Sequence, residues 1–169
     1  MERASRFIYL NKTCYNGLYR ENSKGEFNVP FGRYKNPKIL DENNLKAVSN
    51  YLNSADITII CADYKEVCSM AKSGDFIYLD PPYYPINESY SFTKYTMHNF
   101  TEKDHIELFH TFKELDKKGC KVLLSNSNTE FIKNLYKEYI IEELDSIRAI
   151  NCKGSGRKKG RYELIIRNY

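Results

Sequence analysis

A carboxylate, two prolines and an aromatic ring stand next to one another at the end of a short apolar run. The tetrapeptide Asp80-Pro81-Pro82-Tyr83 directly follows the run Phe76–Leu79. Each proline fixes a φ angle and removes a backbone donor, so the turn is stiff and its carbonyl groups can be aimed outward. The tetrapeptide therefore offers a carboxylate, a carbonyl oxygen and a flat ring close together.

These three groups meet the needs of methyl transfer to an exocyclic amino group. The lone pair of such an amine is delocalised into the base, which makes the nitrogen a poor nucleophile. Asp80 and the carbonyl of Pro81 would accept its two N–H bonds and favour a pyramidal nitrogen with a free lone pair. The ring of Tyr83 would hold a base that has left the duplex, and the methyl donor must lie in line with the nitrogen.

Other interpretations of the tetrapeptide remain open at this stage. The plainest is an Asp-capped, proline-stiffened turn with a surface tyrosine. A serine at position 80 would point towards cytosine, and an asparagine towards other planar nitrogens, including that of protein glutamine. Neither is present, and the aspartate at position 80 fits transfer to an exocyclic amino group of a base.

The elements around the tetrapeptide indicate an α/β fold. Short apolar strands alternating with helices are typical of a parallel sheet that is buried on both faces. Strands are expected at 57–61, 76–79 and 121–125, helices at 102–117 and 128–137, and a closing antiparallel pair at 139–144 and 162–167. Ligands in open α/β sheets lie beyond the carboxyl ends of the strands. Asp80 should face that crevice, and Ser125-Asn126 at its rim would support the Asp80 turn.

Two domains are expected. Residues 1–55 should contain a helix, a hairpin or loop, and a second helix over 41–53 with Asp41 as its N-cap and an apolar stripe of Leu45, Val48 and Leu52. Residues 56–169 would form the catalytic part. In its helix 102–117, Ile106, Leu108, Phe109, Phe112 and Leu115 should line one side.

Composition excludes several classes of protein. No apolar run approaches the roughly 18 residues that span a bilayer, and no signal peptide is recognisable, so a cytoplasmic protein without membrane contact is expected. The five cysteines form no C-x-x-C pair and the three histidines are dispersed, which argues against a metal site. The net charge of +4 permits a nucleic-acid partner without demanding one.

Taken together, the motifs resemble the Dam and DpnM type (D12 class) of DNA adenine methyltransferases. The similarity covers nearly the whole chain. It includes Phe7–Arg20, Gly25–Gly32, Asp80–Tyr83, Phe92–Tyr95 and Leu124–Asn126. It implies a partial Rossmann-like class I methyltransferase fold, mainly parallel, with a target-recognition segment near the N-terminus. It also implies S-adenosylmethionine as methyl donor and double-stranded DNA with GATC-like sites as substrate.

The resemblance assigns DNA contacts to the N-terminal segment. Tyr15 and Asn16 would lie near the displaced adenine, and Leu18, Arg20 and Pro30 would contact neighbouring bases. Arginine can bond a guanine edge, and leucine and proline can touch a thymine methyl group. Phosphate contacts are expected from Arg33, Tyr34 and Lys35. The alternative is a tyrosine-rich hairpin that packs on a core.

Further contacts with the donor and the DNA are expected elsewhere. By the resemblance, Asp63 and Tyr64, at the end of the strand 57–61, would contact the methyl donor together with Asp80; Asp63 would equally suit a helix N-cap. The basic connector 153–161, with Arg157 and Lys158, is either a phosphate grip or a solvated hairpin loop.

The chain departs from the family at its start. Family members carry a further N-terminal segment with a Phe-x-Gly-x-Gly loop, and the only Gly-x-Gly here, Gly154-Ser155-Gly156, follows no strand and opens no helix. The chain is therefore expected to be a C-terminal portion that binds the methyl donor weakly or not at all by itself. It would be one half of a split enzyme, completed by an N-terminal fragment, or a non-catalytic DNA-binding remnant. Asp80 and the segment Tyr15–Arg20 argue against an RNA or protein amide methyltransferase.

Overall fold

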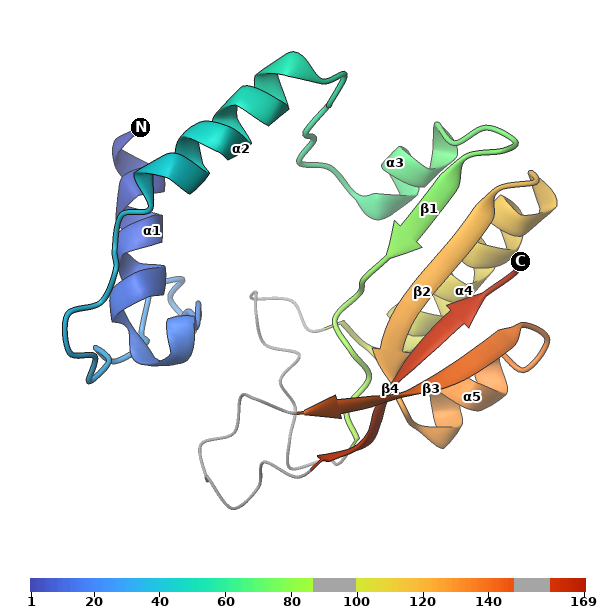
Figure 1. Cartoon of the computed structure of the whole chain (residues 1–169). Coiled ribbons are helices and arrows are strands. Elements are labelled where there is room, and N and C mark those ends of the chain that lie inside the picture. The colour runs from blue at the N-terminus through green and yellow to red at the C-terminus, as the bar shows by residue number, and fades with distance from the viewer. Residues whose placement is uncertain (87–99, 148–158) are drawn as a thin grey trace. The chain divides into compact units, whose positions relative to one another are not determined.

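The computed structural model describes residues 1–86, 100–147 and 159–169. The chain forms two compact units, Met1–Cys61 and Ala62–Tyr169, each of which is described by itself (Figure 1). In the part of the chain that the structure describes, no helix is long and apolar enough to cross a membrane.

The first unit contains two helices with a folded loop between them. Helix α1 spans Glu2–Thr13, the 3-10 turn η1 spans Tyr15–Gly17, and α2 spans Glu42–Ser54. The expected cap of α2 is confirmed, because Oδ1 of Asp41 accepts a hydrogen bond from the backbone N–H of Asn44 at 3.3 Å. Isolated bridges join Cys14 to Phe31 and Glu21 to Phe27, so the loop folds back on itself as a short hairpin.

The apolar stripe expected on α2 does not form a buried face. Leu45, Val48 and Leu52 are 40, 46 and 39% exposed, respectively. Helical periodicity places these side chains on one side of the helix, but burial also requires a partner surface. In the described structure the stripe remains in contact with solvent.

The second unit is built on one sheet. Its helices are α3 (Tyr64–Ser69), α4 (Glu102–Lys117) and α5 (Glu130–Leu135), and its strands are β1 (Phe76–Leu79), β2 (Lys121–Ser127), β3 (Ile140–Ile147) and β4 (Lys159–Arg167). The strands are ordered β1-β2-β4-β3. In Figure 1, α4 and α5 lie behind the sheet, and α3 lies beside β1. The α/β class is thus confirmed, and α5 is shorter than the expected helix 128–137.

The expectation of a mainly parallel sheet is wrong for the described residues. Only β1 and β2 pair in parallel, whereas β4 is antiparallel to both β2 and β3. The expected closing antiparallel pair is therefore confirmed. The run Ile57–Cys61 forms no strand, and Ile59 is 79% exposed. A β-branched apolar run favours extended backbone but becomes a strand only when a neighbour supplies hydrogen bonds.

The core lies between the sheet and α4. Leu108, Phe112 and Leu115 of α4 are at most 3% exposed. They pack with buried side chains of the sheet and α5: Val122, Leu124, Ile132, Leu164 and Ile166. His105 completes the buried face, because positions 105, 108, 112 and 115 recur at helical spacing. Ile106, expected on this face, is 37% exposed instead.

Both ends of α4 follow the sequence signals. The hydroxyl of Thr101 accepts the backbone N–H of Asp104, whose carboxylate accepts the backbone N–H of Thr101, in a reciprocal capping box. Gly119 follows the helix with φ +82°, a conformation that favours glycine. The short turn that follows leads directly into β2, so α4 is fixed against the strand beside Asp80.

Candidate active site

The tetrapeptide 80–83 lies directly after β1, as expected. The register pairs Leu79 with Leu124, which brings the next residues of the two parallel strands, Asp80 and Ser125, side by side. The Ser125 hydroxyl donates to Oδ1 of Asp80 at 2.8 Å. The Tyr78 hydroxyl lies 3.0 Å from the same Ser125 oxygen. Ser125 is buried and Asp80 is exposed, so the carboxylate is fixed from behind and accessible from the front.

The other end of the turn is held through Tyr84. The backbone N–H of Tyr84 donates to Oδ1 of Asn126 at 2.9 Å, and its carbonyl accepts the Ser127 hydroxyl at 2.5 Å. Asn126 is fully buried, and its Oδ1 also accepts the backbone N–H of Ser127 at 2.8 Å. The end of β2 therefore holds the turn on both sides, which confirms the expected support by Ser125-Asn126.

Aromatic packing fixes the side chain of Tyr84. Its ring stacks on Phe131 with centroids 4.5 Å apart and meets the edge of His105 at 5.5 Å. Phe100 packs on the other side of His105 at 4.8 Å. Burial lowers the pKa of His105 to about 4, and the negative charge of Asp104 opposes this shift. Sequence reasoning missed both residues: Tyr84 is a second aromatic after the motif, and His105 shares the helical spacing of the core.

Tyr83 presents a neutral phenol to the site. Pro81, Pro82 and Tyr83 are all partly buried. Burial raises the pKa of Tyr83 above its usual value of 10.0, and a hydrogen bond with Ser125 partly offsets that rise. At neutral pH the residue therefore offers an uncharged aromatic face beside Asp80, which suits stacking on a planar base.

Asp63 caps a helix. Its Oδ1 accepts the backbone N–H of Lys65 at 2.8 Å at the start of α3. It does not follow a strand, because 57–61 is not one. Tyr64 is half-buried, and burial raises its pKa. These contacts establish a structural role for Asp63, which is an exposed residue.

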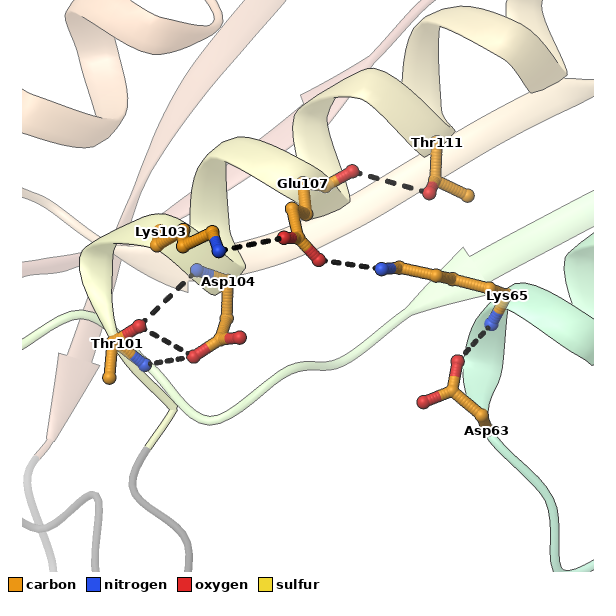
Figure 2. A network of polar contacts seen from close by, with 7 residues as sticks. All are labelled: Asp63, Lys65, Thr101, Lys103, Asp104, Glu107 and Thr111. Carbon is orange, nitrogen blue, oxygen red and sulfur yellow. Dashed lines mark hydrogen bonds and ion pairs between the residues drawn. The ribbon is translucent and has the colours of Figure 1, made fainter.

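An ion pair joins α3 to α4 next to this cap. Nζ of Lys65 lies 2.6 Å from Oε2 of Glu107, as Figure 2 shows together with the capping box of α4. Below the pair, a groove of ≈ 320 Å³ runs between the two helices and includes Cys68, His110 and Lys118 in its lining. Neither Asp80 nor Tyr83 lines this groove, so it is separate from the candidate methyl-acceptor site.

In the first unit, Tyr15 and Asn16 lie in a tight turn. Asn16 has φ 52° and Gly17 has φ 63°, a left-handed pair that short polar residues and glycine tolerate. The Asn11 side chain donates to the carbonyl of Gly17 at 3.0 Å, and Tyr15 N–H donates to the carbonyl of Pro30 at 2.9 Å. The turn thus holds the side chains of Tyr15 and Asn16 at the surface.

Arg20 is held by its cross-hairpin neighbour. Its Nε donates to Oδ1 of Asn28 at 2.8 Å and its Nη2 to the Asn28 carbonyl at 3.1 Å. The hairpin has aromatic packing of its own, since Tyr19 contacts the rings of Phe7 and Phe27, each at 5.6 Å. That packing supports the exposed Arg20 rather than burying it.

Some of the remaining expected DNA contacts lie within the described residues and others lie outside them. Pro30, Arg33 and Tyr34 are exposed, and Leu18 is partly buried. The Tyr34 ring lies on Gly32, where an added Cβ would come within 2.3 Å of it. Arg157, Lys158 and the segment 92–95 lie outside the described residues.

Comparison with known proteins agrees with these motifs. The family described as D12 class N6 adenine-specific DNA methyltransferase matches residues 1–150. The chain is 52% identical over its whole length to the Type II methyltransferase M.MjaIII of Methanocaldococcus jannaschii, of which it covers 58%. It is 44% identical over its whole length to the Type II methyltransferase M1.LlaDCHI of Lactococcus lactis, covering 59%. It is 37% identical over 93% of its length to the DNA adenine methylase of Serratia marcescens, covering 57%. The chain thus spans less than two thirds of the length of these relatives, and it belongs to the D12 class of N6 adenine-specific DNA methyltransferases.

Proposed function

We propose that this chain forms the methyl-acceptor and DNA-recognition part of a site-specific adenine methyltransferase. The enzyme would transfer a methyl group from S-adenosylmethionine to the 6-amino group of adenine, in GATC-like sites of double-stranded DNA. The observation that carries the proposal is the exposed Asp80 carboxylate, held by Ser125 at a strand end beside Pro81 and the neutral ring of Tyr83. A cytoplasmic location goes with a DNA substrate.

The acceptor residues would act on an adenine that has left the duplex. Tyr83 stacks on the base, while Asp80 and the carbonyl of Pro81 accept the two amino hydrogens. The amino lone pair would then point away from the ring towards the methyl carbon of the donor. As the new N–C bond forms, the sulfur–methyl bond would break and leave a neutral thioether, and the methylated nitrogen would release one proton to water. The contribution of these residues is positioning and charge stabilisation.

The donor supplies a methyl group activated by a positively charged sulfur. The residues present suit such a cation, because Asp63 and Asp80 are both exposed carboxylates and the half-buried ring of Tyr64 follows Asp63. We assign these three residues to donor contacts. We propose that they form only part of the donor site.

The first unit would read the DNA. Tyr15 and Asn16 are presented by a rigid left-handed turn near the target base, and Arg20 is aimed by Asn28 for a guanine edge. Leu18 and Pro30 would contact thymine methyl groups. Phosphate contacts would come from the remaining basic and aromatic positions: Arg33, Tyr34, Arg157 and Lys158.

The sheet of the second unit has a free edge where a further segment would pair. In the described residues β1 is an edge strand, and Phe76 and Tyr78 are 58 and 55% exposed. An unpaired edge is a template for another strand. Because the chain covers only 58% of the M. jannaschii relative, we propose that additional N-terminal polypeptide, in the same or a separate chain, pairs here and completes the donor site.

The donor half of the proposal is tested by calorimetric titration of the 169-residue chain with S-adenosylmethionine. We expect no binding below millimolar concentration. Binding in the micromolar range would contradict an incomplete donor site.

The acceptor half is tested by methyl transfer to a duplex with one GATC site, after the part of the M. jannaschii relative that this chain does not cover has been added. We expect transfer to adenine and a loss of about 10²–10³-fold in the Asp80→Ala variant, typical for removing one group that stabilises the transition state. Transfer that survives in Asp80→Ala would overturn the assignment.

The second candidate is a DNA-binding remnant without catalysis. It predicts specific GATC binding by the chain and no methyl transfer under any complementation. The same two assays therefore separate the alternatives.

A further inference from the structure

The Ser125 hydroxyl occupies a position fixed by the sheet. The parallel register of β1 and β2 ends at Leu79 and Leu124, and Asp80 and Ser125 are the residues that directly follow this pair. Ser125 is 3% exposed, and a buried hydroxyl needs partners within the protein. Its partners include the carboxylate of Asp80 at 2.8 Å and the hydroxyl of Tyr78 at 3.0 Å, and Tyr83 also forms a hydrogen bond with it. Tyr78 lies on β1 and Asp80 directly after it, and both side chains reach the same Ser125 hydroxyl.

The direction of both hydrogen bonds follows from the number of available protons. A serine hydroxyl carries one hydrogen and two acceptor lone pairs, and an ionised carboxylate only accepts. Ser125 must therefore donate to Asp80, and Tyr78 must donate to Ser125. In such a series each bond polarises the next, so the Tyr78 bond strengthens the one to Asp80.

The series leaves the two carboxylate oxygens of Asp80 unequal. Oδ1 is engaged by Ser125, and Oδ2 has no partner among the described residues. Because Asp80 is exposed, its carboxylate would rotate between rotamers in water if Oδ1 were not held. Holding Oδ1 fixes the direction in which Oδ2 points.

We propose that Ser125, supported by Tyr78, is a positioning residue that directs Oδ2 of Asp80 at the amino group of the target adenine. The inference rests on the proposed function for the identity of the amino group. The rotamer restraint on Asp80 itself stands independently of that function.

The restraint is measured on the free 169-residue chain by NMR. Three-bond couplings between Hα and Hβ of Asp80 should report one χ1 rotamer in the wild type and averaged rotamers in Ser125→Ala. Tyr78→Phe should give partial averaging. Ser69→Ala is the matched control, since Ser69 donates only to the Glu66 carbonyl on α3. An unaltered Asp80 rotamer in a folded Ser125→Ala chain would overturn the inference.

The consequence for the substrate is measured by fluorescence anisotropy with two duplexes. They differ only in the target base, which is adenine in one and purine, lacking the 6-amino group, in the other. The cost of unpairing the target is the same for every variant and cancels from the comparison. Ser125→Ala should reduce the affinity ratio of adenine to purine about tenfold, the size expected for a hydrogen bond to a charged group. Tyr78→Phe should reduce it about threefold.

Asp80→Ala separates failure of the inference from failure of the proposed function. If Asp80→Ala lowers the ratio and Ser125→Ala does not, the positioning role is wrong and the acceptor role stands. If Asp80→Ala leaves the ratio unchanged, or the wild type binds neither duplex, the proposed function is wrong, and the NMR couplings alone decide whether Ser125 restrains Asp80. Ser69→Ala should keep the wild-type ratio.

Discussion

The two units hold their candidate functional residues by different means. In the second unit, the bonds that fix the Asp80 turn join residues 42 to 47 positions apart, across two neighbouring strands. In the first unit, the bonds around Asn16 and Arg20 join residues six to 15 positions apart, within the segment between the two helices and the end of α1. The proposed acceptor site therefore depends on the tertiary fold. The proposed recognition surface, formed by Tyr15, Asn16, Leu18, Arg20 and Pro30, depends mainly on local geometry.

This difference predicts different responses to mutation. Long-range contacts form only when the whole unit folds, so damage to the core of the second unit should also loosen Asp80. Local contacts tolerate changes nearby, so recognition in the first unit should change with little effect on stability. A methyltransferase of this class would thereby keep its chemistry constant while its DNA contacts vary.

The largest effect is expected for Phe112→Ala in the second unit. Phe112 is fully buried and packs against Tyr136 and Tyr139, with ring centroids 5.4 and 4.6 Å away. Removing a buried aromatic ring should lower the free energy of unfolding by about 3–5 kcal/mol. Urea denaturation followed by circular dichroism measures this change.

Phe31→Ala in the first unit is the matched control. Phe31 is 69% exposed, so its loss should change the unfolding free energy by no more than about 0.5 kcal/mol. An equal loss of unfolding free energy in Phe112→Ala and Phe31→Ala would contradict the expected difference between the two units. If Phe112→Ala does not fold, Phe112→Leu, with an expected loss of roughly 1.5 kcal/mol, makes the same comparison.

The next effect is a pH dependence centred on His105. Its pKa is lowered from 6.5 to about 4 because it is buried among the rings of Tyr84, Phe100 and Phe131. The unfolded chain therefore binds a proton more readily than the folded chain. The contribution of neutral His105 to the free energy of unfolding is therefore complete above pH 6.5. It is lost as the pH is lowered towards 4, by roughly 3 kcal/mol in total.

His105→Leu should remove most of this pH dependence. His110→Gln is the control, because His110 is exposed on the same helix, and it should keep the wild-type dependence. The measurement is urea denaturation at a series of pH values between 4 and 7. If the pH dependence of the unfolding free energy persists in His105→Leu and disappears in His110→Gln, it arises from His110 and the prediction is wrong.

The helices and the buried strands could be predicted from the sequence because their signals are local. Thr101 and Gly119 set the limits of α4 by capping, and the apolar runs at β1 and β2 are too short for helices and follow Gly74 and Gly119 closely. The run Ile57–Cys61 carries the same signal and forms no strand in the described residues. Its residue pattern indicates a preference for extended backbone, but it does not indicate whether a neighbouring strand is available for pairing.

The candidate site was predictable in its chemistry and only partly in its support. Asp80 and the stiff turn after it can be recognised in the sequence as a motif. Ser125 lies at the end of a second strand, which indicated that Ser125 and Asp80 would lie close together. The role of His105 depends on which side of α4 faces Tyr84 and Phe131, and one residue of helical rotation decides it. That rotation placed His105 inside and Ile106 outside.

The smallest effect, and the sharpest test of the first unit, is expected for Asn28→Ala. The Asn28 side chain accepts the Arg20 Nε bond at 2.8 Å, whereas the bond from Nη2 goes to its backbone carbonyl and survives the substitution. The guanidinium is then held at one point instead of two. Binding of a GATC duplex should weaken about threefold to tenfold relative to a duplex of scrambled sequence, measured by fluorescence anisotropy.

The salt dependence of binding shows whether this loss concerns sequence reading. Asn28→Ala removes no charge, so the slope of log affinity against log salt should stay at its wild-type value. Asn53→Ala, which removes an exposed amide bonded to Ser49 on α2, should leave affinity for both duplexes unchanged. Equal weakening of GATC and scrambled duplexes in Asn28→Ala would mean that Arg20 holds phosphate rather than a base. The recognition surface would then depend on charge alone, and the local geometry of the hairpin would not carry its specificity.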